Sequence, residues 1–442
     1  MRVFKTASKQ VGRGIMEYFW VEGRHELGGS ITPIGNKNAA LPLLAACLLT
    51  DETLHLHNVP DIGDVRTKLA LLSKMGVVVQ DGQVGQCSLT ALGVGEQQPD
   101  VELSRQIRTA TLLAGPLLAR RGHVVISRPG GDRIGRRRLD THLLALQALG
   151  ATIEVYPDRF ELRTDGLRGC DIFLDEMSVT GTEQAVFASV LAEGTTTLAN
   201  VAMEPHVQEV CHCLNAMGAK IEGIGTHNLT VEGVTRLHGA THRIGPDYME
   251  VGSLIGLAAA TGSALRIEQA RPDQHRMTRI MFGRLGVTWD VEGEDIVVPP
   301  DQSLEVQTDF DGAVPKIDDM PWPGFPPDLI SIALVVATQA RGTVLIHQKM
   351  FDQRLVFADR LIDMGAGIVL CDPHRAVVMG PSQLRGQNLV SPDIRAGMAL
   401  VIAALAAEGV STIHNIIQID RGYEQLERRL QGLGAHIERL SE

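Results

Sequence analysis

The sequence predicts an α/β fold assembled from six similar units, and two sets of glycines support that prediction. The first set ends six apolar helical runs and leads into segments with a strand pattern. Its members are Gly76, Gly150, Gly218, Gly286, Gly365 and Gly434. A glycine just past a helix adopts the left-handed conformation that a β-carbon disfavours. Because these glycines recur at intervals of 68 to 79 residues, they indicate a repeated supersecondary unit.

The second set of glycines alternates with the first, and each member closes an Ala/Leu-rich helix before a β-branched strand. These are Gly122, Gly194, Gly262, Gly342 and Gly409, followed by HVVIS, TTTLANV, SALRIEQ, TVLIHQ and VSTIHNI. The first unit has Leu48–Glu52 in the equivalent place, before TLHLHNV. Each unit therefore follows the order strand, helix, strand, helix, and then a strand or a strand pair. This alternation favours an α/β class over a bundle or a sandwich, and it leaves the strand order within each sheet open.

Length and composition are compatible with six units in two lobes of three. The chain has 442 residues, of which 44% are hydrophobic and only 4% aromatic, so aliphatic side chains must fill the cores. A net charge of −11 argues against non-specific nucleic-acid binding, although it allows a local basic pocket. No apolar run approaches the roughly 20 residues that cross a bilayer. The basic start, MRVFKTASKQVGRG, lacks the apolar core of a secretion signal, so we expect a cytoplasmic protein.

The cysteines and histidines do not predict a metal site. The six cysteines form no CxxC pair, and Cys211 and Cys213 are too close for a normal metal knuckle. The fifteen histidines show no HExxH spacing. We therefore expect buried or incidental thiols, no bound catalytic metal and no cofactor.

Three polar loops are the candidates for chemistry. The first, GNKNAALP, places Lys37 at the start of an apolar helix, where free backbone N–H groups and a lysine favour an anion; the alternative is a capped helix with a solvated lysine. The second, at 128–140, contains Pro-Gly-Gly and then four arginines within six residues. Such concentrated positive charge suggests a phosphate or carboxylate ligand, or else a solvated basic loop. The third, QIDRGYE, places Arg421 at a strand-to-helix turn.

These loops belong to a wider resemblance, which runs from about Val21 to Ile437. Six segments together resemble the UDP-N-acetylglucosamine enolpyruvyl transferases. They are GNKNAALPLLAACLLTDETLHLHNVPDIGDV, PGGDRIG, SVTGTEQ, LAEGTT, FPPDL and IDRGYE. The shikimate-phosphate branch of the same superfamily is a poorer match, since it has Ser-Lys-Ser where this chain has Asn36-Lys37-Asn38. The resemblance implies an inside-out α/β barrel in two lobes, each of three βαβαββ units. The expected lobes are residues 1–36 with 246–442, and residues 37–245.

The resemblance also implies a reaction. The enolpyruvyl group of phosphoenolpyruvate passes to the 3-hydroxyl of UDP-N-acetylglucosamine with release of phosphate, the first committed step of peptidoglycan precursor synthesis and thus a step in cell-wall biogenesis, cell shape and division. The two small molecules are the expected partners, and no obligate protein partner is evident.

The matching positions assign roles to individual residues. The implied phosphoenolpyruvate site comprises Lys37, Asn38, Arg137, Arg395 and Arg421. The implied sugar-nucleotide site comprises Arg108, Arg137, Arg138, Leu139, Asp140, Ser178, Val179, Asp328 and Met350. The implied catalytic residues are Asp132, Asp328, Lys37 and Arg421. Asp328 matches the carboxylate that accepts the proton of the sugar hydroxyl, although an Asp after two prolines is also a candidate helix N-cap.

Asp132 is the main departure from the family pattern, which usually has cysteine as proton donor at this loop position. An aspartate serves as an acid near neutral pH only if its pKa rises well above about 3.9. Nearby arginines lower that pKa, so desolvation must oppose them. We interpret Asp132 as a working variant. Because a carboxylate is a weaker nucleophile than a thiolate, we expect resistance to epoxide inhibitors such as fosfomycin.

Further departures lie on the acceptor side. Arg138 replaces a proline, Glu176 a lysine and Thr180 a glycine of the family pattern. Arg138 and Glu176 suggest a compensating charge swap beside the diphosphate. Two alternatives therefore remain beside the main hypothesis. One is the same chemistry on another uridine nucleotide or nucleotide sugar, and the other is a paralogue that binds the nucleotide sugar without turnover.

Overall fold

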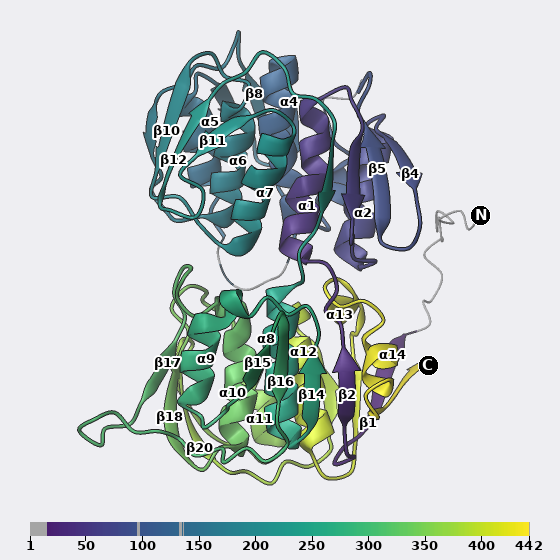
Figure 1. Cartoon of the computed structure of the whole chain (residues 1–442), viewed down its shortest axis with the longest axis vertical. Helices are drawn as coiled ribbons and strands as arrows, with labels where there is room; N and C mark the ends of the chain where they lie inside the picture. Colours follow the sequence, from purple (N-terminus) through teal and green to yellow (C-terminus); the bar gives the residue numbers. More distant parts are fainter. Residues whose placement is uncertain (1–15, 95–97, 132–134, 136, 442) are drawn as a thin grey trace.

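The chain forms two bodies stacked along the long axis of the molecule (Figure 1). The computed structural model describes residues 16–94, 98–131, 135 and 137–441. One hydrophobic core is drawn from residues 39–244, and the other from residues 19–31 and 248–437. The chain crosses between the bodies twice, before residue 37 and after residue 243, and the two crossings pair through a bridge between Gly35 and Pro246. We propose that the lobe boundaries expected from the sequence, 36/37 and 245/246, lie at these crossings.

The body built on residues 37–243 contains three units. Its elements are α1 (Lys37–Ala46), η1 (Cys47–Leu49), β3 (Leu54–His57), α2 (Gly63–Lys74), β4 (Val78–Asp81), β5 (Gln86–Thr90), α3 (Val101–Ser104), η2 (Arg108–Leu113), α4 (Ala114–Arg121), β6 (His123–Ser127), α5 (Asp140–Ala148), β7 (Thr152–Val155), β8 (Arg159–Arg163), β9 (Asp171–Phe173), α6 (Val179–Ser189), β10 (Thr195–Ala199), α7 (Pro205–Ala216), β11 (Lys220–Glu222), β12 (Asn228–Glu232) and β13 (Ala240–Arg243). We call it the N-terminal body.

The second body, which we call the C-terminal body, also includes the first two strands of the chain. Its elements are β1 (Glu17–Glu22), β2 (Gly28–Ile31), α8 (Tyr248–Thr261), β14 (Ala264–Ile267), η3 (Pro272–His275), α9 (Arg276–Gly283), β15 (Asp290–Glu292), β16 (Asp295–Val298), β17 (Lys316–Asp318), η4 (Pro327–Leu329), α10 (Ile330–Gln339), β18 (Gly342–His347), α11 (Ala358–Asp363), β19 (Gly367–Asp372), β20 (Arg375–Gly380), β21 (Asn388–Val390), α12 (Ile394–Ala406), β22 (Val410–His414), α13 (Ile417–Asp420), α14 (Leu426–Gln431) and β23 (His436–Ser441).

The strands form six separate sheets, five of four strands and one of three, and none of them closes into a barrel within the described ranges. In a complete unit such as β9–α6–β10–α7–β11–β12, the first two strands are parallel, and β12 pairs with β10 and β11 in antiparallel fashion. Three sheets recruit a strand from elsewhere in the chain: β13 pairs with β3, β2 with β14, and β1 lies between β22 and β23. The three-stranded sheet is β6-β8-β7.

The backbone confirms the left-handed conformation predicted for the first set of glycines, and the second set also has positive φ. The six glycines of the first set have φ between 81° and 102°, and the five of the second set between 64° and 130°. These values lie in the region that side chains with a β-carbon rarely adopt. The repeated glycines therefore mark real ends of helices in all six units.

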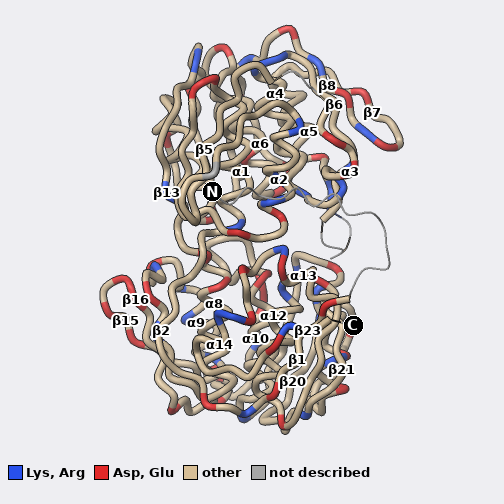
Figure 2. Tube along the Cα trace, turned by 90° about the vertical axis from the view of Figure 1, so that its right-hand side faces the viewer, with Lys and Arg blue, Asp and Glu red and all other residues tan. Residues whose placement is uncertain are grey.

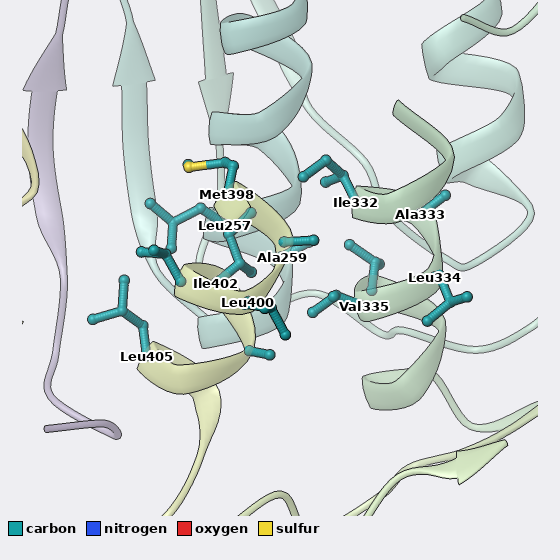
Figure 3. Close-up of a cluster of buried hydrophobic side chains, with 14 of the residues drawn as sticks. Leu257, Ala259, Ile332, Ala333, Leu334, Val335, Met398, Leu400, Ile402 and Leu405 are labelled. Carbon is teal, nitrogen blue, oxygen red and sulfur yellow. The ribbon is translucent and has the colours of Figure 1, made fainter. Parts of the chain in front are cut away.

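Each body buries helices at its centre and places its sheets outside them. In the C-terminal body, α8, α10 and α12 pack on one another through aliphatic side chains such as Leu257, Val335 and Leu400 (Figure 3). These helices are apolar almost all round, as expected for helices with no solvent-facing side. Helices α1 and α6 are buried in the same way in the N-terminal body. Along the described part of the chain, no helix combines the length and the apolar character needed to cross a membrane.

Candidate active site

A cavity of about 380 Å³ lies between the two bodies and contains most of the residues predicted for the site. The predicted residues that line it are Lys37, Asn38, Arg108, Arg137, Arg138, Ser178, Val179, Asp328, Met350, Arg395 and Arg421. Leu139 and Asp140 do not line it; Leu139 immediately precedes α5, and Asp140 is its first residue. Asp132 lies outside the described residues. Figure 2 shows charged segments of both signs from both bodies near the level where the bodies meet.

The buried helices explain why residues far apart in sequence meet here. Lys37 begins α1, Val179 begins α6, Tyr248 begins α8, and Arg395 is the second residue of α12. The N-termini of these helices therefore face the cavity, where their free N–H groups and partial positive charge favour anions. Several of these ends are capped by side chains, for example by Asn36 at α1 and Asp393 at α12.

Asp64 joins cations from the two bodies. Its carboxylate lies 2.8 Å from Lys37 Nζ and 2.8 Å from Arg421 Nε, which come from the N-terminal and the C-terminal body respectively. The helix is capped by Asn36, as the alternative for this loop proposed, but Lys37 is only 7% exposed, so the solvated lysine of that alternative is wrong. Arg421 also donates to Gln418 Oε1 and follows the short helix α13, which the sequence pattern did not predict between strand and helix. This cluster places two positive groups side by side with one shared counter-charge.

Asp328 lies at the centre of a second charge cluster, formed within the C-terminal body. It accepts from Arg395 Nε at 2.9 Å and from Arg354 Nη2 at 2.5 Å, and Arg354 also contacts Asp393. Burial alone raises the pKa of Asp328, but the guanidinium groups of Arg354 and Arg395 outweigh it and hold that pKa well below its usual range. Asp328 lies within η4 and does not cap a helix, because Pro326 occupies the N-cap position.

The arginines of the N-terminal body form the other wall. Arg108 Nη2 donates to the Arg138 carbonyl at 2.7 Å, and the guanidinium of Arg137 lies 6.0 Å from the ring centre of Phe351 in the C-terminal body. Burial, with Arg137 nearby, lowers the pKa of Arg108 to about 10. Arg138 pairs with Asp140 and Asp175, at 3.1 and 3.4 Å. Among the described carboxylates, Asp140 and Asp175 form the ion pairs of Arg138, and Glu176 does not. The charge swap predicted between Arg138 and Glu176 is therefore a longer-range attraction and not a direct pair.

The lining of the cavity also includes buried polar groups that the sequence did not single out. Burial raises the pKa of Glu183 and Glu204, and it lowers the pKa of His206 to about 4. His206 Nδ1 lies 3.4 Å from the hydroxyl of Tyr248, which belongs to the other body. Burial thus works against a charge on each of Glu183, Glu204 and His206.

The cavity therefore has an excess of positive charge within an acidic chain. Seven basic side chains line it (Lys37, Arg108, Arg137, Arg138, Arg354, Arg395 and Arg421). Among the acidic lining residues, Asp64 and Asp328 are each shared by two cations. Such a local potential attracts small anions whatever the net charge of the chain.

Asp64 and Arg354 were not predicted from the sequence. Asp64 lies within the quoted segment PDIGDV, where an acid in the first turn of a helix has an ordinary explanation as a partner for the helix dipole. Arg354 belongs to no quoted motif. Only the folded geometry shows that both are counter-ions of predicted site residues.

Comparison with known proteins defines the family. The model of the EPSP synthase (3-phosphoshikimate 1-carboxyvinyltransferase) family matches residues 21–430. The chain belongs to this family. Within it, relatives from Bradyrhizobium diazoefficiens and Treponema denticola are 54% and 53% identical over 96% of this chain, covering 98% and 99% of their own lengths. Both are named UDP-N-acetylglucosamine 1-carboxyvinyltransferase.

Solved structures confirm the enolpyruvyl transferase fold. The enolpyruvyl transferase NikO from Streptomyces tendae superimposes with a TM-score of 0.86 at 22% identity, over 97% of this chain and all of its own. An EPSP synthase from Acinetobacter baumannii gives 0.73 at 18% identity, over 96% of this chain. The predicted two-lobed α/β fold of the enolpyruvyl transferase type is thus confirmed.

Proposed function

We propose that this chain transfers the enolpyruvyl group of phosphoenolpyruvate to the 3-hydroxyl of UDP-N-acetylglucosamine and releases phosphate, and that it does so in the cytoplasm. Relatives at above 50% identity over nearly the full length bear the name of this activity. The single structural observation that supports it most is the convergence of cations from both bodies on one cavity that also contains Asp328.

Phosphoenolpyruvate requires such a convergence because it carries both a phosphate and a carboxylate. Lys37 and Arg421 are held together by Asp64, while Arg395 lies beside Asp328. We assign the phosphate to Lys37, Arg137 and the helix N-terminus at Asn38, and the carboxylate to Arg395 and Arg421. Anions bound between two bodies draw them together, and exclusion of water then strengthens each contact.

The acceptor hydroxyl needs a base, and Asp328 is the proposed one. Its two guanidinium contacts keep the carboxylate ionised, which is the form that accepts a proton. The same contacts make it a weak base, so the sugar hydroxyl must displace one of them to be activated. The contact to be displaced is the one with Arg354, because the proposed phosphoenolpyruvate site uses Arg395 but not Arg354.

The reaction is an addition followed by an elimination. In the addition, the sugar oxygen bonds to C2 of the enol, Asp328 takes the hydroxyl proton, and an acid delivers a proton to C3. In the elimination, C3 loses a proton and the bond from C2 to the phosphate oxygen breaks. The proposed acid is Asp132, whose role stays a prediction because it lies outside the described residues.

The acceptor side of the cavity is proposed to hold the nucleotide sugar. Arg108, Arg138, Ser178, Val179 and Met350 line it. Leu139 and Asp140 follow Arg138 at the start of α5, and Arg138 Nε donates to Asp140 Oδ2, so we propose that they act through the loop backbone or through Arg138.

The deciding experiment measures phosphate release from phosphoenolpyruvate with UDP-N-acetylglucosamine, with UMP, and without acceptor. Release only with the sugar nucleotide supports the proposal. Release with UMP at a similar rate would point to a different acceptor. Nucleotide-sugar binding without release in any reaction would overturn the proposal in favour of a non-catalytic paralogue.

A further inference from the structure

A cluster of two imidazoles and one carboxylate lies on the C-terminal body, outside the cavity described above. Glu22 ends β1, His25 lies three residues later, and His436 begins β23. None of the three lines the cavity. The proposed transferase reaction gives them no role.

The three side chains converge on one point. Glu22 Oε2 lies 3.0 Å from His25 Nε2 and 3.3 Å from His436 Nδ1, and one ligand atom from each residue falls within 4.8 Å of the others. The two rings stack with their centres 3.5 Å apart and their planes inclined by 17°, so at least one ring must rotate about χ2 before both nitrogens can direct a lone pair at one ion.

These separations fit a metal shell. Zinc binds imidazole nitrogen and carboxylate oxygen at about 2.0–2.2 Å, so two ligand atoms of a tetrahedral site lie about 3.3 Å apart. The observed nitrogen–oxygen distances of 3.0 and 3.3 Å are close to that value. Nitrogen and oxygen donors of this kind suit borderline divalent ions such as zinc, cobalt and nickel.

The backbone holds the donors in place. Glu22 and His436 are direct partners in the antiparallel pairing of β1 with β23. Between Glu22 and His25 the chain turns sharply, with Arg24 at a φ of 61° and the amides of Gly23 and Arg24 bonded to the Gly409 and Leu405 carbonyls. A β-carbon on Gly23 would lie 2.1 Å from the Ala407 oxygen, so the turn has little freedom to move. Donors on a fixed backbone lose little entropy when an ion binds.

We propose that Glu22, His25 and His436 form a binding site for one divalent transition-metal ion of the zinc type, with water completing its shell. Such an ion links the turn after β1 to β23 and so fastens the first strand of the C-terminal body to the last. Glu22 and His436 are 414 positions apart, which is why no sequence spacing predicts the site. The side chains are between 33% and 54% exposed, so the ion has a direct path from solvent.

The test uses the untagged full-length chain, freed of metal and titrated with zinc and with cobalt by calorimetry and visible absorption. We expect one ion to bind, zinc to raise the thermal unfolding temperature, and cobalt to give the intense absorption of a low-coordinate site. His25→Gln, His436→Gln and Glu22→Gln are each expected to weaken binding more than about tenfold and to abolish the thermal shift.

His123→Gln is the matched control. His123 also lies beside a glutamate, with its Nε2 2.9 Å from Glu161, but no second histidine joins this pair to form a three-residue cluster in the described structure. The exposed Cys371 is kept in every chain, so its contribution to binding cancels. Equal zinc affinity in the wild-type chain and His436→Gln, or an equal loss in His123→Gln, would overturn the proposal. If a histidine variant did not fold, the wild-type chain would still test the proposal. The absence of the intense cobalt absorption from the wild-type chain would by itself overturn the proposal. The readouts do not involve catalysis, so the result is independent of the proposed function.

Discussion

Asp64→Asn is the substitution that best tests how the two bodies share charge. Asp64 lies between Lys37 and Arg421, and its side chain and that of Lys37 are less than one-tenth exposed. At 2.8 Å and an effective dielectric constant of 20, each contact has a gross attraction of about 6 kcal/mol. Most of this attraction is offset by the desolvation of the charges. Removing one partner of a buried cluster nevertheless costs about 3–5 kcal/mol, because the remaining charges stay buried.

The matched control is Asp61→Asn. Asp61 pairs with Arg66 at 2.6 Å, but both side chains are more than 40% exposed. Exposed pairs contribute about 0–1 kcal/mol, so this variant is expected to unfold at nearly the wild-type urea concentration.

The assay is urea unfolding of both variants with and without inorganic phosphate. We expect a lower midpoint for Asp64→Asn, and we expect phosphate to restore more of the lost stability in this variant than in Asp61→Asn, because the anion replaces the missing carboxylate between Lys37 and Arg421. Equal midpoints for the two variants would refute the reasoning. An equal effect of phosphate on both would show that the anion binds elsewhere.

Three other predictions concern catalysis, titration and inhibition. Asp328→Asn is expected to lower kcat by about 10²–10⁴-fold, as measured by phosphate release; activity within tenfold of wild type would exclude Asp328 as the base. Burial lowers the pKa of Lys68 to about 7, and its Nζ donates to the Thr109 carbonyl. In the unfolded chain the same amine keeps its proton up to about pH 10.4. The unfolded state therefore binds more protons between pH 7 and 10, and the free energy of unfolding of the wild-type chain rises with pH over this range. Lys68→Met removes that gain, so its urea midpoint relative to wild type should be highest near pH 7 and fall toward pH 10, and a constant difference would contradict this. Asp132→Cys is expected to gain time-dependent inactivation by fosfomycin with a matching mass adduct; adduct formation at Asp132 in the unmodified chain would disprove the expected resistance.

The repeat was predictable because it depends on local backbone preference. A glycine such as Gly150 needs a left-handed conformation for reasons that lie within a few residues of it. Strand pairing is different, since β13 joins β3 across the whole N-terminal body and β1 joins β23 across most of the chain. Nothing local to residues 240–243 indicates which sheet they complete. The sequence pattern therefore left the strand order open.

The site was predictable where its residues belong to motifs, and it was missed where a side chain acts only through its neighbours. Lys37 and Arg421 were found because their loops match a family pattern. Arg354 was not predicted, because its position is defined by contacts with Asp328 in η4 and with Asp393 at the start of α12. A counter-ion of this kind has no signature of its own in the sequence.

Counter-ions such as Asp64 also connect substrate binding with the arrangement of the two bodies. Asp64 and Lys37 belong to one body and Arg421 to the other, so the bridge forms only while the bodies are close. A phosphate or carboxylate that enters must compete with Asp64 for the same cations. The carboxylate therefore stabilises the ligand-free arrangement and weakens anion binding at the same time. We therefore expect Asp64→Asn to bind phosphate more tightly than wild type while being less stable, and these two opposite changes follow together from a counter-ion that competes with the ligand.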